Sequence, residues 1–440
     1  MFQTLRNAWN IVDLRKKIFY TLFIILIFRI GSAIAVPFVD TGALADAIGL
    51  AAATAKENNT ANFMDFLSMM SGGGFSDASI FALSITPYIT SSIVIQLLTV
   101  AIPALERMAK EGEDGRRKIN KITRYVTVAL ALLQAWAYYT LLRNQSGAVM
   151  YRSGFAGIFS AIVIIAAFMG GAMLIVYLGE RIDEHGIGNG ISMILFAGIV
   201  SRGPAAIQKL WIYLQMGSEQ PMYYFTVPLI VVLFLALIVV IIIMTNAERR
   251  IPVQYAKKVV GRKMYGGQST FIPIKVNMSG VLPIIFASSL LAIPGTIKAF
   301  VAPNGTGFWA NFLGAFNYNT PLYAVLYFIL ILAFNYFYVA IQYNPIEMSN
   351  NLRNNSGTIP GIRPGRPTSD FIARIISKIT LVGGIFLALV AVLPIGIGGI
   401  TKMNIALGGT SIIIVVGVAL DTFRQLESQM MMRHYKGFLE

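Results

Sequence analysis

Four ionisable side chains lie within one short stretch of the sequence and are the first candidates for chemistry. Glu180, Asp183, Glu184 and His185 occur in the segment GERIDEHGIGNGIS. Carboxylates and imidazoles at such short spacing are common metal ligands. Arg181 stands among them, however, and the glycines that follow indicate a tight loop entering a helix. We therefore expect no metal and no cofactor here.

Other catalytic chemistry finds even less support in the residue types. The chain has no cysteine, which excludes disulfides, thiolate metal sites and a cysteine nucleophile. Its two histidines, His185 and His434, lie far apart in the sequence. The glycines after residue 185 do not match a dinucleotide-binding fingerprint, because their spacing is wrong and no strand precedes them. We expect that the chain is not an enzyme.

The composition is that of a membrane protein. Of the 440 residues, 56% are hydrophobic and only 12% are charged, and the mean hydropathy is +0.67. A soluble domain carries about 25% charged residues. Because a soluble core cannot hide so much apolar side chain, we expect an all-α protein that crosses the membrane several times.

Ten apolar stretches are long enough to span a bilayer, at about 20 residues for each crossing. Their approximate limits are 18–36, 75–101, 119–142, 154–178, 187–204, 222–245, 271–296, 318–343, 374–395 and 405–424. Arg29 is almost the only charge inside them, and we expect carbonyls or hydroxyls of neighbouring helices to satisfy it. Ion-coupled transporters need several ionisable groups at this depth, so coupled transport is disfavoured.

Basic residues are distributed unevenly between the two sides that alternating spans define. With the N-terminus inside, 27 of the 35 Lys and Arg residues fall on the cytoplasmic side. The other side keeps only Lys56, Arg143, Arg152, Arg202, Lys209, Lys298 and Lys402. This bias predicts that both termini are cytoplasmic.

The stretch from Ala61 to Ala101 is unusual for a membrane anchor. It contains a short apolar helix candidate, Asn62–Met70, which three glycines follow. After these comes a membrane-length apolar segment that carries several polar side chains and that Pro87 interrupts. Its polar residues are Ser84, Thr86, Thr90, Ser91, Ser92 and Gln96. Each costs free energy in hydrocarbon, so they face protein, water or a passing ligand. Hydrogen bonding between helices is the simpler interpretation, and the residues alone leave both open.

Two of the predicted cytoplasmic loops are larger than is needed to orient the helices in the membrane. The loop over residues 247–270 alternates polar and apolar residues, which favours a protruding β-hairpin. The loop over residues 344–370 is rich in Pro, Gly and Asn. Both carry basic residues, which are typical of a solvated cytoplasmic loop or of a docking surface for a large acidic partner.

Seven motifs, found in order along essentially the whole chain, resemble the SecY family of protein-translocation channels. They are FRIGS from Phe28, SIFALSITPYITSSIVIQLL from Ser79, GERIDEHGIGNGIS from Gly179, IPVQYAKK from Ile251, KVNMSGVLPIIFASS from Lys275, GIRPG from Gly361 and GGTSIIIVV from Gly408. The resemblance implies two inverted five-helix halves around an hourglass pore. The halves would be residues 1–204 and 222–424, with a hinge loop over 205–221 and a cytoplasmic tail over 425–440.

The resemblance also implies how the pore is sealed. The apolar pore ring would consist of Ile85, Ile89, Ile191, Leu195, Ile285 and Ile414, where leucine at 195 departs from the family's isoleucine. The plug, a half-helix within residues 61–71, would consist of Asn62, Phe63, Met64, Asp65, Phe66, Leu67, Ser68, Met69 and Met70. Gly72, Gly73 and Gly74 would form its hinge.

A lateral gate and a docking surface complete what the resemblance implies. The gate residues would be Thr86, Thr90, Ser91, Gln96, Asn277, Ser288, Ser289 and Ile293. The docking residues would be Arg249, Arg250, Lys257, Lys258, Arg363 and Arg366. The implied partners are the small subunits SecE and SecG, the motor ATPase SecA, the ribosome, signal peptides, unfolded precursors and membrane lipids. The implied location is the bacterial cytoplasmic membrane.

Two other classes of function remain as alternatives. A small-solute channel or uniporter also predicts hydroxyl-lined helices with little buried charge, but it explains neither the glycine-rich stretch nor the large basic loops. A membrane enzyme acting on lipids requires catalytic residues, which the sequence does not supply.

Overall fold

The structure is a computed structural model. It describes residues 9–44, 71–144, 147–218, 221–255, 258–260, 263–265, 269–301, 312, 320–401 and 409–436. The predicted plug, Asn62–Met70, and the predicted docking residue Lys257 lie outside the described residues.

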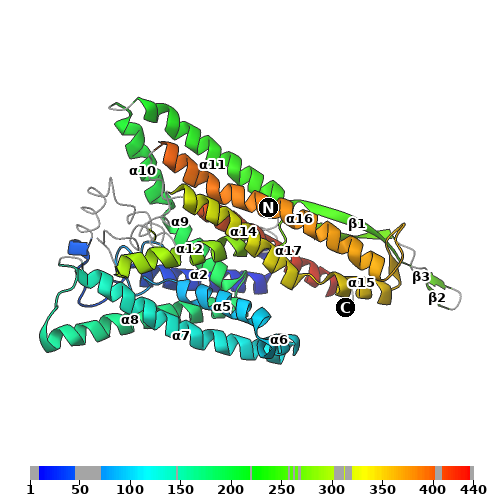
Figure 1. Cartoon of the computed structure of the whole chain (residues 1–440), viewed down its shortest axis with the longest axis horizontal. Helices are drawn as coiled ribbons and strands as arrows, with labels where there is room; N and C mark the ends of the chain where they lie inside the picture. The colour runs from blue at the N-terminus through cyan, green and yellow to red at the C-terminus, as the bar shows by residue number, and fades with distance from the viewer. Residues whose placement is uncertain are drawn as a thin grey trace.

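Helices dominate the described chain, because a helix satisfies its backbone hydrogen bonds internally in an apolar medium. They are α2 (Val12–Ala33), α5 (Thr86–Ala101), α6 (Pro103–Lys110), α7 (Glu113–Asn144), α8 (Gly154–His185), α9 (Gly190–Ser201), α10 (Gly203–Gln215), α11 (Met222–Asn246), α12 (Leu282–Val301), α14 (Pro321–Gln342), α15 (Pro345–Asn354), α16 (Arg366–Thr401) and α17 (Gly409–Lys436) (Figure 1). A short 3₁₀ turn, Met216–Ser218, follows α10.

Six described helices are long and apolar enough to cross a membrane. They are Glu113–Arg143, Gly154–His185, Gly190–Gln215, Met222–Asn246, Pro321–Asn354 and Arg366–Ile397. A seventh candidate is the pair α5 and α6, which is bent by 105°. Each of the ten predicted spans contains a described helix. The number of crossings, ten, stays a prediction.

Two predicted spans begin later than the sequence suggested. Residues 71–85 form turns, and α5 begins only at Thr86. Pro87 stands in the first turn of α5, where its missing N–H costs nothing, so it starts this helix instead of interrupting it. Ser84, with a φ of 50°, has the left-handed backbone that prevents the helix from extending backwards. The start of predicted span 271–296 is likewise a strand, and α12 begins at Leu282.

Two segments predicted as loops contain helices. The predicted hinge loop, 205–221, is mostly occupied by α10, whose Pro204 lies in the first turn. The predicted loop 344–370 begins with α15, which Asn344 caps by accepting hydrogen bonds from Ile346 N and Glu347 N. The Pro, Gly and Asn content that indicated a loop over 344–370 did not reveal α15, because Asn344 and Pro345 start this helix instead of breaking it.

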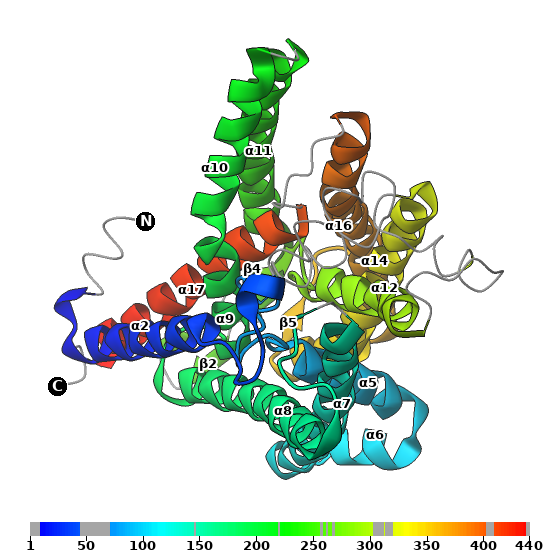
Figure 2. The ribbon, with the colours of Figure 1, turned by 90° about the vertical axis from the view of Figure 1, so that its left-hand side faces the viewer.

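The main hydrophobic core lies where most of the membrane-length helices meet. Its buried side chains come from α2, α5, α8, α9, α11, α12, α14, α16 and α17. Viewed along the long axis, α9 lies near the middle of the molecule (Figure 2). The α5, α7 and α8 helices lie on one side of it, and α12, α14 and α16 lie on another (Figure 2).

A small antiparallel sheet projects from one end of the helices. Its strands are β1 (Glu248–Tyr255), β4 (Ser269–Lys275) and β5 (Gly357–Thr358), in the order β4-β1-β5. A second pair, β2 (Lys258–Val260) and β3 (Lys263–Tyr265), extends the hairpin (Figure 1). The predicted hairpin is therefore confirmed. The sequence did not reveal β5, which joins the second loop to the first.

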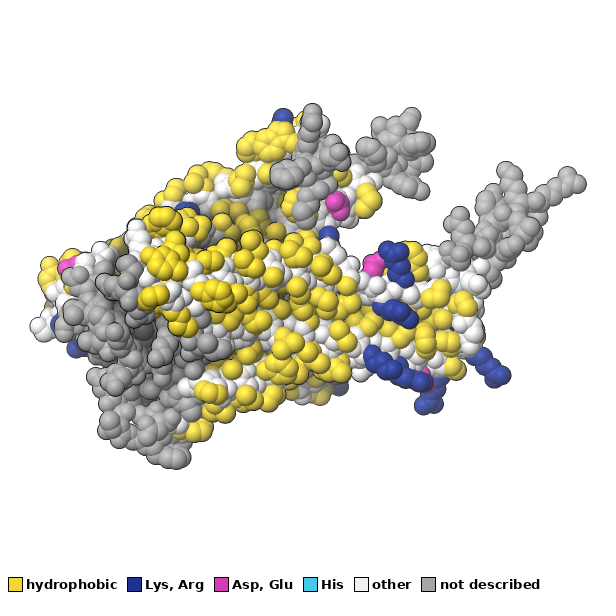
Figure 3. Space-filling model, turned by 90° about the horizontal axis from the view of Figure 1, so that it is seen from above, with side chains coloured by type: hydrophobic (Ala, Val, Ile, Leu, Met, Phe, Trp, Pro, Cys, Tyr) yellow, Lys and Arg dark blue, Asp and Glu magenta, His cyan; other side chains and the backbone are white. Residues whose placement is uncertain are grey.

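Basic side chains gather at the end of the molecule that carries this sheet. Lys and Arg of the described residues cluster there, whereas hydrophobic side chains cover the middle of the visible face (Figure 3). The C-terminal end of α17 points toward the same end (Figure 1). This separation of charge from apolar surface is the pattern expected of a protein that lies across a bilayer.

Candidate functional site

The six predicted ring residues meet in the same hydrophobic core. Ile85, Ile89, Leu195, Ile285 and Ile414 are all buried members of the main cluster, and Ile191 packs against it. They come from the start of α5, from α9, from α12 and from α17. Four separate elements thus contribute the predicted ring residues to one apolar core.

Seven of the eight predicted gate residues lie on two helices that contact each other, α5 and α12, and Asn277 lies in the connection before α12. Their hydroxyls, however, bond within their own helices: Thr90 Oγ1 to Thr86 O at 3.0 Å and Ser288 Oγ to Ile285 O at 2.9 Å. Among the described residues, no hydrogen bond joins α5 to α12. The seam between these helices is therefore held by apolar contacts.

The opposite side of α5 is bonded to its neighbour. Ser91 Oγ donates to Pro87 O at 2.6 Å and accepts a hydrogen bond from Thr127 Oγ1 of α7 at 2.9 Å. This hydrogen bond between helices is the structural role that the sequence left open for the hydroxyls of this stretch. Gln96 is partly buried, and Asn277 has a buried Oδ1 without a partner among the described residues.

The predicted hinge glycines pack against the end of α9. Gly72 and Gly73 have φ values of 66° and 102°, which other residues rarely adopt. A Cβ on Gly72 would lie 3.1 Å from Gly198 Cα. The glycines therefore supply both the left-handed turn and the close contact.

Arg29 is satisfied at this same point. Its Nη1 donates to Gly72 O at 2.9 Å, to Ser201 Oγ at 3.3 Å and to Ser32 Oγ at 3.4 Å. A carbonyl and two hydroxyls from three elements thus surround the guanidinium. The expectation that neighbouring carbonyls and hydroxyls satisfy Arg29 is confirmed.

The described docking residues lie on or beside the projecting sheet. Arg249 and Arg250 are exposed on β1, and Lys258 begins β2. Arg250 pairs with Glu248 at 2.7 Å and lies over the ring of Phe271. Arg363 and Arg366 are also exposed. Within the described chain, neither Arg363 nor Arg366 has an ion-pair partner, so both are available to a partner's acidic groups.

Two side-chain hydrogen bonds hold the turn that carries Arg363. Arg363 O accepts a hydrogen bond from Thr368 Oγ1 at 2.9 Å, and Gly365 O accepts one from Ser349 Oγ at 2.9 Å. Gly361 and Gly365 both have positive φ values, which glycine adopts without strain. Strand β5 pairs with β1 a few residues earlier. The two basic loops therefore form one surface.

The four candidate metal ligands do not gather. Glu180 pairs with Arg124 at 2.8 Å, Glu184 pairs with Arg181 at 2.7 Å, and Asp183 Oδ1 accepts from Gly190 N at 2.7 Å. Among the described residues, no group of three His, Asp or Glu side chains has metal-binding geometry. The segment instead links α8 to α9.

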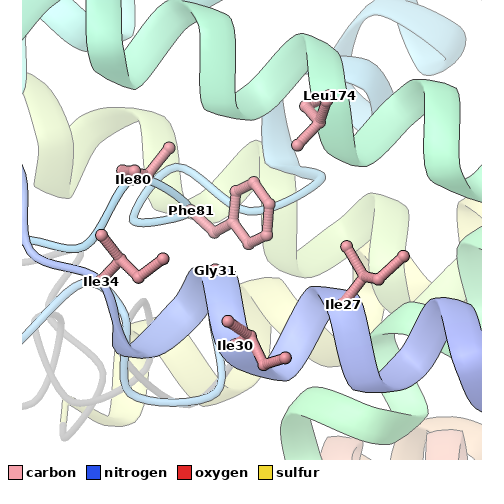
Figure 4. A pocket seen from close by; sticks show the side chains of 7 residues that line it. All are labelled: Ile27, Ile30, Gly31, Ile34, Ile80, Phe81 and Leu174. Atoms are coloured by element: carbon pink, nitrogen blue, oxygen red, sulfur yellow. The ribbon is translucent and has the colours of Figure 1, made fainter.

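An apolar groove lies between α2, α8 and the turns around Ile80 and Phe81 (Figure 4). Its lining residues are Ile27, Ile30, Gly31, Ile34, Ile80, Phe81 and Leu174. None of them belongs to the predicted ring, gate or docking surface. With no polar side chain in its lining, the groove offers no chemistry.

Sequence reasoning missed the residues that fix α12 to the rest of the molecule. Asn335 of α14 is buried and bonds to both Ser279 and Thr380 O. Its signal was available, because a lone amide in the apolar run FILILAFNYFYVA needs a partner inside the protein. The identity of that partner depends on tertiary packing.

Comparison with known sequences places the chain among translocase subunits. The SecY family model matches residues 79–423. Protein translocase subunit SecY of Mycobacterium bovis is 40% identical over 454 residues, covering all of both chains. The corresponding subunit of Streptomyces coelicolor is 41% identical over 451 residues, again covering all of both chains. That of Thermotoga maritima is 39% identical over 440 residues, covering all of this chain and 98% of the relative.

Solved structures share the fold. A protein-conducting channel superposes with a TM-score of 0.60 at 18% identity, covering 94% of this chain and 92% of the other. Sec61 from a canine ribosome-channel complex gives a TM-score of 0.56 at 17% identity over the same shares. Together with the identity to the bacterial subunits over the full length, these matches show that the chain belongs to the SecY family of protein translocase subunits.

Proposed function

We propose that this chain is the channel through which unfolded secretory polypeptides cross the cytoplasmic membrane, and from which apolar segments leave sideways into the lipid. The observation that carries the proposal is that separate elements contribute the six ring residues to one apolar core, in which five of them are buried. Such a seal tolerates any substrate sequence, because it depends on apolar bulk and on no specific bond.

Closure would combine the ring with the plug. The ring residues exclude water and ions by leaving no wettable path between them. The plug, Asn62–Met70, would cover the ring on the outer side at rest and swing about Gly72–Gly74 when a polypeptide enters. The positive φ of Gly72 and Gly73 supports a role for these glycines as the hinge.

Opening would separate two inverted halves, residues 1–204 and 222–424, about a hinge near α10. The seam between α5 and α12 would be the lateral gate for signal peptides and membrane segments. Its contacts support this role, since α5 and α12 touch without any hydrogen bond between them in the described chain. Parting such a seam leaves no buried polar group stranded.

The chain contains no energy source in this mechanism, and a partner performs the work. The basic surface of the sheet, with Arg249, Arg250, Arg363 and Arg366 exposed, would dock the motor ATPase SecA or the ribosome. Small subunits SecE and SecG would complete the channel. Both termini would lie in the cytoplasm, on the same side as this basic surface.

A small-solute channel is not favoured. Its strongest argument was the set of hydroxyls on α5, and those of Thr90 and Ser91 bond to backbone carbonyls of the same helix. It also leaves the paired basic loops without a role.

The test is precursor transport into proteoliposomes. The full chain is reconstituted with SecE and SecG and supplied with SecA, ATP and a secretory precursor, and protease protection of the precursor is measured. We expect ATP-dependent protection that Arg363→Glu abolishes. Arg117→Glu, the same charge reversal at an exposed position of α7, is the matched control and should transport normally. No protection by the folded wild-type chain would overturn the channel, and normal transport by Arg363→Glu would overturn the docking assignment.

A further inference from the structure

The connection that leads into α12 is fixed by a buried polar network. Ser279 Oγ donates to Asn335 Oδ1 of α14, and Asn335 Nδ2 donates to Thr380 O of α16 at 2.8 Å. Ser279, Asn335 and Thr380 are at most 3% exposed. The amide group thus bridges three elements, and each of its two ends has a partner.

Two glycines of α16 make room for this network. A Cβ on Gly384 would lie 2.7 Å from Asn335 Nδ2, and a Cβ on Gly383 would lie 2.4 Å from Val276 O. Since real Cβ atoms do not approach backbone oxygen this closely, residues 276–279 and Asn335 pack directly against the backbone of α16. Met278 adds apolar contacts in the cluster that includes Val339 and Ile376.

Residues 276–281 connect the projecting sheet to α12. On the sheet side, Val276 N donates to Ala247 O at 2.9 Å, which holds the connection next to β1. On the helix side, Gly280 has a φ of 64°, and nothing lies within 4 Å of where its Cβ would be. Ser279 is thus held by its hydrogen bond, and the next residue is a glycine, whose backbone angles no side chain restricts.

We propose that the Ser279–Asn335–Thr380 network is the fixed end of α12: it positions the start of this helix on α14 and α16, so that α12 pivots at Gly280 when it parts from α5. The inference rests on the proposed role of the α5–α12 seam as lateral gate. Asn335 and Ser279 are positioning residues, which act through the placement of α12 and contact no substrate.

The network should set how selective the gate is. With its start held, α12 keeps its apolar face on α5 until a sufficiently apolar segment competes for that contact. Asn335→Leu leaves Ser279 and Thr380 O without their partner and frees the start of α12. The closed seam then loses its fixed support, so a weaker signal is enough to open it.

The first experiment measures transport of two precursors, one with an intact signal and one with a defective signal. For each variant the measured quantity is the transport of the precursor with the defective signal divided by that of the precursor with the intact signal. Asn335→Leu and Ser279→Ala should each raise this ratio by about threefold to fifteenfold, the range for the loss of one hydrogen bond between membrane helices. Both remove the Ser279–Asn335 hydrogen bond, and Asn335→Leu also removes the bond to Thr380 O, so the double variant should behave like Asn335→Leu alone. Thr123→Val, which removes a buried hydroxyl that bonds only within α7, is the matched control and should leave the ratio unchanged.

The second experiment links the two residues covalently. The chain has no cysteine, so Ser279→Cys with Asn335→Cys offers a unique pair for a short bifunctional thiol reagent. The linked protein, verified by mass, should transport the intact precursor at the wild-type rate and regain selectivity. The wild-type chain and Ser279→Cys alone, treated identically, show the effect of the reagent.

Each outcome of these two experiments either supports the proposal or overturns it. Blocked transport in the linked protein would show that this end of α12 must move, and would overturn the proposal. So would an unchanged ratio in Asn335→Leu, or a parallel fall of both precursors in a folded protein. If the wild-type chain transports neither precursor, the channel itself fails, which is a separate result from failure of the fixed end.

Discussion

The two sides of α12 are held in different ways. Toward α14 and α16, buried hydrogen bonds of Ser279 and Asn335 and the close approach to Gly383 fix its start. Toward α5, apolar side chains such as Ile285 and Ile89 make the contact. In the described chain, no hydrogen bond crosses from α12 to α5.

This difference separates contacts that must persist from contacts that must break. A buried hydrogen bond is costly to leave unmade, whereas apolar surface that parts within a membrane can be covered by lipid or by an apolar substrate segment. The same rule applies to α5, whose Ser91 is bonded to Thr127 of α7 on the side away from α12. At the α5–α12 seam, the directional bonds thus lie within each proposed half and apolar contact lies between the halves. Elsewhere hydrogen bonds do join the N-terminal half to α17, as where Gly188 N donates to Gln425 Oε1 at 2.7 Å.

The largest effect is expected from making the opening contact polar. Ile285 is 4% exposed, so Ile285→Asn buries an amide at the apolar contact and destabilises the closed state by about 1–3 kcal/mol. The chain should then transport precursors with defective signals about tenfold better or more, as the protease-protection assay measures.

The matched control for this variant is Leu290→Asn, the same kind of change at an exposed position of α12. It should leave discrimination between precursors unchanged. Equal relaxation by both variants would show that any polar residue on α12 loosens the channel, and the distinction between its two sides would fail.

Prediction from sequence succeeded where a local pattern decides the structure. Alternation along residues 248–255 indicated the hairpin, and the lone charge of Arg29 indicated nearby carbonyls and hydroxyls. It failed at Pro87, which was interpreted as a break but lies in the first turn of α5, because proline starts a helix as readily as it ends one. It also missed α15 in the predicted loop 344–370, whose Pro345 lies in the first turn.

The functional residues depended on a different kind of information. The ring and gate positions came from resemblance to a family, since an isoleucine in an apolar helix carries no signal of its own. Asn335 was visible as a costly amide, but its pairing with Ser279 and Thr380, 56 and 45 residues away, is a property of the packed fold. No local pattern encodes that distance.

An effect on stability instead of selectivity is expected at the close approach between α16 and the connection that leads into α12. Gly383→Ala places a methyl group 2.4 Å from Val276 O, so the connection before α12 must shift. Overpacking of this kind should lower the free energy of unfolding in mild detergent by about 1–3 kcal/mol. Gly396→Ala on the same helix, where the added Cβ meets nothing within 4 Å, should be neutral or slightly stabilising. If both variants lose the same unfolding free energy, the loss is a general effect of alanine in α16. The close contact with Val276 would then not explain it.

The smallest effects on the free energy of unfolding are expected when two threonines of the N-terminal half are each replaced by valine. Thr127 is fully buried and donates to Ser91 across the α5–α7 contact, so Thr127→Val should cost about 0.5–1.5 kcal/mol of unfolding free energy. The hydroxyl of Thr90 bonds only to Thr86 O within α5, so Thr90→Val should change that free energy by less than about 0.5 kcal/mol. Denaturation in the same detergent measures both. If Thr90→Val costs as much as Thr127→Val, the side of α5 that faces the seam carries polar stabilisation, and the contrast between persisting and opening contacts does not extend to this helix.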